Sequence, residues 1–369
     1  MDSDAPTPLQ RASELGQSVW IDSLSREWTR GGYLRKLIDE DAVVGATSNP
    51  TILQKAMSHG DAYDEQLRSL SHLDSDAAFW ELAVTDIAEA CDVFAPVFQA
   101  TGGRDGYVSL EVDPTLAYET LRTYEEAIGL HERVDRPNLL VKIPATKPGL
   151  AAIEDVIAKG RSVNVTLIFS LRRYAEVAES YIRGLERLVA AGGDPDKVAS
   201  VASFFVSRID TEADNRLDAL GGHDELRGKL AVANARLAYE HYKGAFSGPR
   251  WEFLAGKGAR PQRVLWASTS TKNPAYPDTL YVDELIGPDT VNTMPLETLE
   301  AYQDHGQPEA RLERDLQGAH ELLASLAAAG VDYEDITETL EREGVEKFSA
   351  SFAELLDGLR AKHASLAPA

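Results

Sequence analysis

A lysine lies inside one of the most apolar short runs of the sequence. Residues 138–143 read Asn-Leu-Leu-Val-Lys-Ile and end at Pro144, so Lys142 stands where a core side chain is expected. Such a run, closed by a turn, is typical of a strand in a parallel sheet, where lysine is rare. Burial disfavours the charged form of an amine, and a neutral amine can attack a ketone to form a Schiff base. Alternatively, the lysine stem packs in the wall while its head reaches water at the strand end. The run alone leaves both interpretations open.

Two carboxylates belong to other apolar runs. Asp22 comes directly after such a run, where it could cap the next segment or exchange a proton with a substrate hydroxyl. Glu111 stands between Leu110 and Val112 and has no local structural duty, whereas Asp113 is best explained as a helix N-cap. A glutamate buried near a lysine is a candidate proton shuttle.

Amide and hydroxyl side chains stand in two further runs. Asn49, within Thr-Ser-Asn-Pro-Thr, either initiates a turn or offers its amide to a polyol. Asn164 and Thr166 are two residues apart and therefore share one face of a strand, opposite apolar residues that include Leu167. Polar groups that face a core need partners, which a water or a bound sugar would supply.

Cationic and hydroxyl side chains follow the last runs. Arg208, Ser268 and Lys272 lie in segments where α/β barrels often bind phosphate through serine hydroxyls, backbone N–H groups and a cation. We therefore expect these three residues to bind phosphate. A surface ion pair with Asp210 would also explain Arg208.

Eight predicted strands position these residues. Apolar, β-branched runs bounded by turns predict strands over residues 18–24, 42–48, 107–112, 138–143, 162–169, 198–206, 263–268 and 290–294. Eight alternations with helices indicate an α/β fold, a single closed (β/α)₈ barrel of the TIM type with extra N- and C-terminal helices. A doubly wound open sheet would normally show a glycine-rich first turn and fewer strands.

Segments with helical periodicity lie between and after these strands. It predicts helices over residues 75–100, 116–134, 148–160, 171–191 and 225–246, and a helical tail over 309–366. Pro96 should kink the first of these helices or end it early. No linker-like tract interrupts the chain, so we expect one domain over residues 1–369, with the barrel strands within about 18–295.

Composition excludes several functions. A net charge of −23 opposes nonspecific binding to nucleic acids and anionic membranes. No apolar stretch of membrane-spanning length and no secretory signal is apparent, so we expect a cytoplasmic protein. Cys91 is the only cysteine and is expected to be a buried small apolar side chain. Scattered histidines predict no catalytic metal, and the lack of a glycine-rich nucleotide motif predicts no cofactor.

Taken together and in order, these motifs resemble the transaldolase family. The resemblance runs from about residue 18 to residue 306 and rests on the strand that ends at Asp22 and on residues 47–51, 109–112, 141–146, 164–170 and 203–208. It implies transfer of a dihydroxyacetone unit in the non-oxidative pentose phosphate pathway. The donor would be sedoheptulose 7-phosphate or fructose 6-phosphate, and the acceptor glyceraldehyde 3-phosphate or erythrose 4-phosphate. Sugar phosphates would be the partners, and the sequence leaves monomer and homodimer open.

The resemblance also implies catalytic roles. Lys142 would form the Schiff base, and Asp22 would handle the proton of the hydroxyl released on cleavage. Glu111, with Thr166 and an ordered water, would move protons as the imine forms and breaks down.

Binding roles follow in the same way. Asn49 and Asn164 would hold the dihydroxyacetone unit, with Ser203 lining the site. Arg208 and Ser268 would bind the phosphate. Many family members carry arginine in the stretch that here contains Lys272, and the loop around it differs in size. The tail after about residue 309 carries no motif that suggests a role.

Two alternative functions remain open on the sequence. A fructose 6-phosphate aldolase would release free dihydroxyacetone, but such relatives are shorter and lack a glutamate at the place of Glu111. A catalytically silent barrel could bind sugar phosphates as a sensor, although binding alone does not need a reactive amine.

Overall fold

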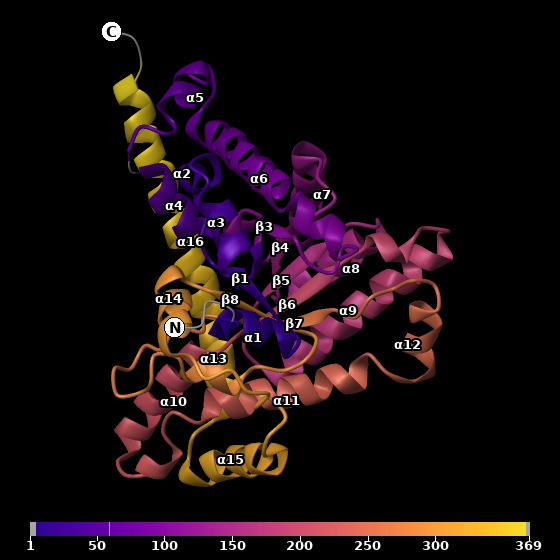
Figure 1. Ribbon diagram of the computed structural model, residues 1–369, viewed down its shortest axis with the longest axis vertical. Coiled ribbons are helices and arrows are strands. Elements are labelled where there is room, and N and C mark those ends of the chain that lie inside the picture. The colour runs from indigo at the N-terminus through magenta and orange to yellow at the C-terminus, as the bar shows by residue number, and fades with distance from the viewer. Residues whose placement is uncertain (1–4, 59, 367–369) are drawn as a thin grey trace.

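Eight parallel strands close into a barrel in the order of the sequence (Figure 1). The computed structural model describes residues 5–58 and 60–366. The strands are β1 (Gln17–Ile21), β2 (Val43–Ala46), β3 (Val108–Glu111), β4 (Leu139–Pro144), β5 (Val163–Ile168), β6 (Ser200–Phe205), β7 (Arg263–Ala267) and β8 (Thr290–Met294). Each overlaps the range predicted for it, and β1 pairs with β8 to complete the circle. The predicted closed (β/α)₈ barrel is confirmed.

Almost all side chains of the strands are buried, either in the lumen or under the helices. Apolar residues therefore predominate in these strands. β1 and β2 pack closely against each other. A Cβ atom on Gly45 would lie 2.5 Å from the Trp20 ring, so only glycine lets β2 lie against this indole. At the amino-terminal end of the barrel, Asp105 accepts hydrogen bonds from Ser18 and Arg263 and holds β1 and β7 together.

Sixteen α-helices surround or extend the barrel within the described residues. Those up to the fourth strand are α1 (Pro8–Glu14), α2 (Arg26–Arg30), α3 (Tyr33–Glu40), α4 (Pro50–Ser58), α5 (Asp64–Ser69), α6 (Ser75–Ala100) and α7 (Thr120–Val134). The remainder are α8 (Lys147–Ala158), α9 (Leu171–Ala190), α10 (Ser207–Leu220), α11 (Leu230–Ala245), α12 (Gly248–Ala255), α13 (Leu280–Glu284), α14 (Leu296–His305), α15 (Leu316–Ala329) and α16 (Tyr333–Leu366). None of them is both long and apolar enough to cross a lipid bilayer.

Pro96 does not end its helix. The prediction of an early end is wrong, because α6 contains Pro96 and continues to Ala100. Cys91 and Phe94 of this helix are fully buried, and the Thr101 N–H still bonds to the Val97 carbonyl after the proline. Packing of the apolar stripe therefore outweighs the one backbone hydrogen bond that proline removes.

Three predicted helix boundaries are corrected by local breaks. The predicted helix over 116–134 begins only at Thr120, after the 3₁₀ turn Pro114–Leu116 that Asp113 caps as expected. The predicted helix over 225–246 begins at Leu230, because Gly228 adopts a left-handed φ of 64°. Gly330, with φ of 94°, likewise divides the predicted tail into α15 and α16, and residues 309–315 are not α-helical.

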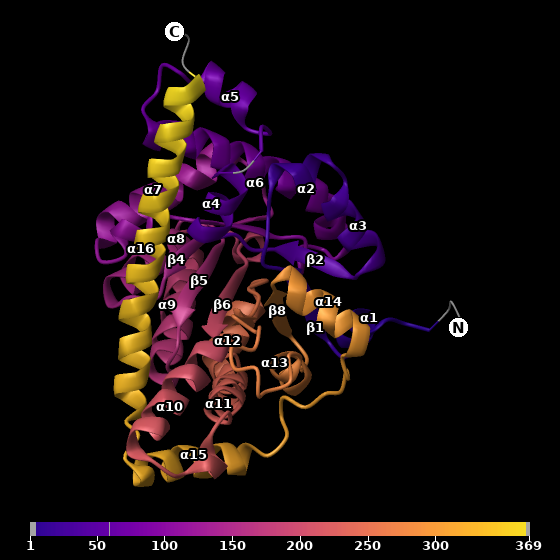
Figure 2. The ribbon, with the colours of Figure 1, turned by 90° about the vertical axis from the view of Figure 1, so that its left-hand side faces the viewer.

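The long helix α16 runs along one side of the molecule. Figure 2 shows it as the yellow helix that extends from the level of α15 to that of α5, past α10 and α4. It packs against α4 and α6 and also touches β5. A segment distant in sequence from the barrel strands thus becomes part of the wall around them.

A bulge breaks the regular alternation of β5. The register with β6 shifts between Val165 and Ile168, and Leu167 has a left-handed φ of 60°. The side chain of Leu167 consequently packs against α16, where a Cβ atom on Gly344 would lie 3.0 Å from it. The period of two is therefore interrupted at Leu167, whose side chain takes part in the packing against α16.

Candidate active site

Lys142 lies in the barrel wall between two polar neighbours. It is paired in register with Glu111 on β3 and with Asn164 on β5. Its side chain is 6% exposed, and Nζ lies 3.2 Å from Oε2 of Glu111. Nζ also donates a hydrogen bond of 3.2 Å to the Ser48 carbonyl. The amine therefore stays inside the barrel and does not reach out to water at the strand end.

Glu111 is a buried carboxylate with spare hydrogen-bonding capacity. Apart from the ion pair with Lys142, neither of its oxygens has a hydrogen-bond partner among the described residues. Burial raises the pKa of the Glu111 carboxyl, against the opposing effect of the Lys142 charge. The hydroxyl of Thr166 is also buried and unpartnered within the same described residues. A buried polar group normally has a partner, so both groups are available to a water or a substrate.

Asp22 follows β1 and is held by hydroxyl groups. Oδ1 accepts a hydrogen bond of 2.6 Å from the Thr47 hydroxyl, which lies 2.7 Å from the Thr293 hydroxyl. Burial raises the pKa of Asp22, whereas the charge of Lys142 and the Thr47 hydrogen bond oppose this change. The structure therefore contains two carboxyl groups that accept protons more readily than exposed ones, and both interact electrostatically with Lys142.

Asn164 connects β5 to its neighbouring strands. Its amide nitrogen donates to the Ser109 hydroxyl at 3.0 Å, and its amide oxygen accepts from the Ser203 hydroxyl at 2.7 Å. Asn49 combines two features, because its oxygen accepts from the Ile52 N–H at the start of α4 while the side chain also lines the cavity. The role of Asn49 in the turn is therefore confirmed, and binding of a polyol by its amide stays a prediction.

The predicted residues surround a narrow cavity at the carboxyl ends of the strands. It has a volume of about 130 Å³ and shares six lining residues with a wider cavity of about 610 Å³. Eight predicted residues line the narrow cavity: Asp22, Asn49, Lys142, Thr166, Ser203, Arg208, Ser268 and Lys272. The other two, Glu111 and Asn164, do not line it but contact Lys142 and Ser203, which do.

Two cationic residues belong to both the narrow and the wide cavity. Both cavities include Arg208 and Lys272 in their walls, whereas Lys142 lines only the narrow one. Arg208 does not pair with Asp210, which is buried and accepts hydrogen bonds from the Ala231 N–H and the Tyr281 hydroxyl. The surface ion pair considered as an alternative is therefore wrong.

Hydroxyl groups complete this end of the site. Ser268 has a left-handed φ of 57°, and its hydroxyl lies 2.9 Å from that of Ser207 at the start of α10. Lys272 donates a hydrogen bond to the Ser270 hydroxyl. A site with a buried amine, two carboxyls of raised pKa and a cationic mouth can form an imine with an anionic carbonyl compound and move its protons.

Several lining residues escape analysis of the sequence. Thr47 and Thr293 position Asp22, and Phe348 of α16 places its ring 5.6 Å from Nζ of Lys142. The threonines stand at the ends of predicted strands, which is a usable signal. Phe348 has no such signal, because only the course of α16 brings it to the cavity.

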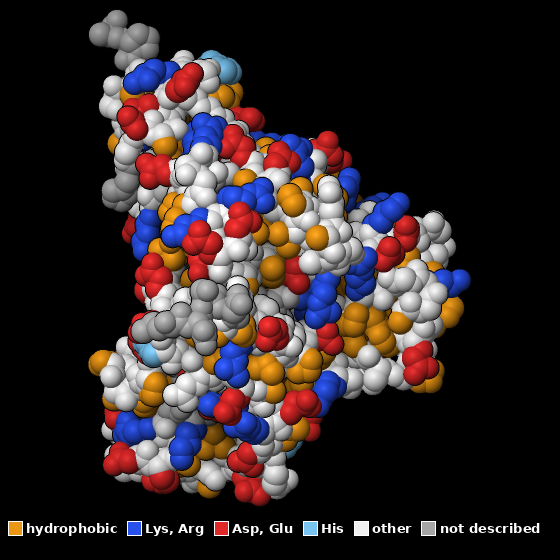
Figure 3. Space-filling model, viewed as in Figure 1, with side chains coloured by type: hydrophobic (Ala, Val, Ile, Leu, Met, Phe, Trp, Pro, Cys, Tyr) orange, Lys and Arg blue, Asp and Glu red, His pale blue; other side chains and the backbone are white. Residues whose placement is uncertain are grey.

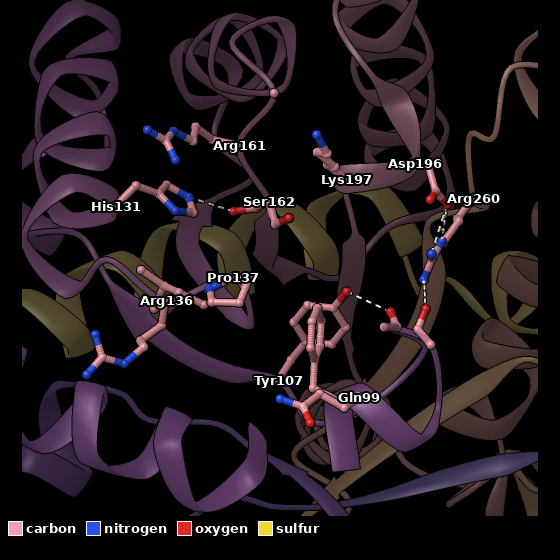
Figure 4. A pocket seen from close by; sticks show the side chains of 15 residues that line it. Gln99, Tyr107, His131, Arg136, Pro137, Arg161, Ser162, Asp196, Lys197 and Arg260 are labelled. Carbon is pink, nitrogen blue, oxygen red and sulfur yellow. Dashed lines mark hydrogen bonds and ion pairs between the residues drawn. The ribbon is translucent and has the colours of Figure 1, made fainter. Parts of the chain in front are cut away.

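A further cavity, of about 520 Å³, lies at the amino-terminal ends of the strands, where Tyr107, Leu139 and Ser162 line it. Figure 4 shows this cavity from close by. There the Tyr107 hydroxyl bonds to the Gly103 carbonyl, and Arg260 pairs with Asp196. Burial lowers the pKa of His131 to about 4, so this histidine is neutral near pH 7. Barrel enzymes place their chemistry at the carboxyl ends of the strands, which favours the smaller cavity around Lys142 as the active site.

No group of three His, Cys, Asp or Glu side chains among residues 5–58 and 60–366 is arranged as metal ligands would be. The polar groups that line the narrow cavity are instead two amines, a carboxylate, hydroxyls, an amide and a guanidinium group.

Known proteins resemble this chain over nearly its full length. A family model described as Transaldolase/Fructose-6-phosphate aldolase matches residues 19–359. A transaldolase of Frankia alni is 53% identical over 354 residues, which are 95% of each chain. A transaldolase of Parafrankia is 54% identical over 98% of this chain and 99% of the relative, and one of Mycobacterium ulcerans is 52% identical over 100% of both. The chain belongs to the transaldolase/fructose-6-phosphate aldolase family.

Proposed function

We propose that the protein is a transaldolase that transfers a dihydroxyacetone unit from a ketose phosphate to an aldose phosphate through a Schiff base on Lys142. The donor would be sedoheptulose 7-phosphate or fructose 6-phosphate, and the acceptor glyceraldehyde 3-phosphate or erythrose 4-phosphate. The observation that carries this proposal is the buried Lys142 amine, 3.2 Å from Glu111 in a cavity that Asp22 also lines.

The first half of the reaction forms and uses the imine. Nζ of Lys142 adds to the ketose carbonyl, and the resulting carbinolamine loses water with protons supplied and removed by Glu111, assisted by Thr166 and a water. Asp22 then takes the proton of the hydroxyl on the second carbon from the imine carbon. The bond between the first and the second of these carbons breaks, and the deprotonated hydroxyl becomes the aldehyde of the leaving aldose phosphate. The protonated imine nitrogen accepts the electron pair of that bond, so an enamine remains on the lysine and an aldose phosphate leaves.

The second half reverses these steps on a different aldehyde. The enamine carbon attacks the acceptor carbonyl, and Asp22 returns its proton to the new hydroxyl. Water then adds to the new imine, which frees the Lys142 amine and releases the new ketose phosphate. The raised pKa of Asp22 suits a group that must take and return a proton in one cycle. A narrow cavity also limits the access of water to the enamine.

Binding groups hold the two ends of the substrate. Asn49 and Ser203, with Asn164 behind Ser203, would hold the hydroxyls of the dihydroxyacetone unit. Arg208, Ser268 and Lys272 would bind the phosphate through charge-assisted and hydroxyl hydrogen bonds.

A borohydride trap tests the proposal directly. The protein is incubated with fructose 6-phosphate, reduced with borohydride and digested, and the peptides are mapped by mass. We expect a three-carbon adduct on Lys142 only, and its loss in Lys142→Ala but not in Lys147→Ala, which alters an exposed lysine nearby. An intact fold in Lys142→Ala, checked by circular dichroism, is required. A folded wild-type protein without any lysine adduct would refute the proposal.

The alternative activity within the family, aldol cleavage with release of dihydroxyacetone, differs in its need for an acceptor. We expect turnover of fructose 6-phosphate to depend on erythrose 4-phosphate, with almost no free dihydroxyacetone in its absence. Cleavage at full rate without the acceptor would establish an aldolase in place of a transaldolase.

A further inference from the structure

We propose that Lys347, on the C-terminal helix α16, is a third phosphate-binding residue of the active site and makes that helix a determinant of specificity for phosphorylated sugars. The inference rests on the proposed function and extends it to a residue outside all of the sequence motifs. Lys347 lines the wide cavity together with Arg208 and Lys272, which come from α10 and from the loop after β7.

The three cations interact with one another across this cavity. The charge of Arg208, followed by burial, lowers the pKa of Lys347. Burial, followed by the charge of Arg208, lowers the pKa of Lys272, and Lys347 contributes in the same direction. Like charges in such proximity repel, so the arrangement costs free energy unless an anion offsets it.

No acidic side chain among the described residues neutralises this cluster. Neither Arg208, Lys272 nor Lys347 forms an ion pair with any of those residues. The charges of Asp22, Glu297 and Glu343 act on it only from beyond ion-pair distance. Other arginines near the barrel behave differently, since buried Arg26 pairs with Asp86 and buried Arg263 with Asp105. Cations left unpaired beside the reactive lysine are arranged as an anion site.

The helix that carries Lys347 is fixed on both sides of it. Before Lys347, Glu341 pairs with Arg173 at 3.1 Å. After it, the Thr51 hydroxyl donates to the Ser351 hydroxyl at 2.9 Å, and the Phe352 ring packs edge-on against Phe79. Anchors on both sides of the site hold a binding group in place before the substrate arrives.

The position of Lys347 also indicates which part of the substrate it meets. Phe348, the next residue, lines both the narrow and the wide cavity, whereas Lys347 lines only the wide one. A ketose whose carbonyl has reached Lys142 therefore extends its other end toward Lys347. That end carries the phosphate monoester, a dianion that a lysine binds as a point charge.

The test separates phosphate recognition from the chemistry on Lys142. Phosphorus NMR titration of the unreduced protein with inorganic phosphate, at low and constant ionic strength, measures anion affinity without turnover. We expect Lys347→Ala to weaken phosphate binding by about tenfold and to raise KM for fructose 6-phosphate by about tenfold. This is the effect of losing one hydrogen bond to a charged group. The value of kcat/KM for unphosphorylated fructose should stay within about twofold of wild type. Lys347→Arg should restore most of the affinity.

Arg360→Ala is the matched control, because it also removes one exposed positive charge from α16, and its partner is Asp357 on the same helix. It should leave phosphate affinity unchanged. If phosphate affinity falls in Lys347→Ala but not in Arg360→Ala, the assignment is supported, whether or not an adduct forms on Lys142. Unchanged phosphate affinity in Lys347→Ala overturns it, even in an enzyme that forms the adduct.

Discussion

At the scale of single residues, the environment of Glu111 gives the clearest kinetic prediction. Burial raises the pKa of this carboxyl above its ordinary value of 4.5, so its carboxylate form is lost at a higher pH than that of an exposed glutamate. If Glu111 moves protons during imine formation, Glu111→Gln should lower kcat by about 10²- to 10⁴-fold with little change in KM. It should also remove the part of the acid limb of the pH–rate profile that Glu111 causes. Steady-state kinetics from pH 5 to 9 measure both effects.

Glu111→Asp provides the control for this variant. It keeps an ionisable group on β3 but shortens its reach to Lys142, so part of the acid limb should return. A variant Glu111→Gln that raises only KM would show that Glu111 binds substrate and does not transfer protons.

At the scale of elements, close packing of α8 on α9 depends on one glycine. A Cβ atom on Gly184 would lie 2.7 Å from the Ile157 side chain and 2.9 Å from the Glu154 carbonyl oxygen. The two helices would have to separate, so Gly184→Ala should lower the free energy of unfolding by about 1–3 kcal/mol. Urea denaturation followed by circular dichroism measures the change.

Gly129 in α7 is the matched control, because nothing lies within 4 Å of the Cβ atom that alanine would add there. Gly129→Ala should stabilise the protein by about 0.5–1 kcal/mol through helix propensity alone. Equal effects of the two substitutions would show that packing of α8 on α9 tolerates the extra methyl group.

At the scale of the whole molecule, acidic and basic side chains are interspersed over the surface shown in Figure 3, although the net charge is −23. The pH dependence of stability follows instead from groups whose pKa differs between the folded and unfolded states. Burial raises the pKa of Glu126 to about 7, against a hydrogen bond from the Asp113 N–H. Because its pKa is higher in the folded state, Glu126 contributes stability that is fully present below about pH 4.5 and is lost as the pH rises through about 7.

Glu126→Gln keeps an oxygen for the Asp113 N–H and does not ionise. Its stability relative to wild type should therefore be greater at pH 8 than at pH 5, by about 1–3 kcal/mol. Glu125→Gln, on the exposed side of the same helix, should show no such difference. If the difference in the free energy of unfolding between wild type and Glu126→Gln is the same at pH 5 and pH 8, the assignment is contradicted.

The sequence determined the barrel and most of its site, because both depend on local patterns. Apolar runs of strand length recur eight times between helical segments, and a barrel is the arrangement that buries all of them. Polar residues such as Asp22 and Thr166 stand at or near strand ends, and parallel strands bring those ends together in space. The position of a residue along its own strand was therefore enough to place it near Lys142.

Only the tertiary structure decided how α16 contributes. Its residues 347 and 348 reach the cavity because the chain after Gly330 turns back along the barrel, a course that no local pattern encodes. The bulge at Leu167 and the continuation of α6 through Pro96 have the same origin. In each case, packing between segments far apart in sequence outweighs a local preference of about 1–3 kcal/mol. Such packing energies exist only once the partner segments are in place.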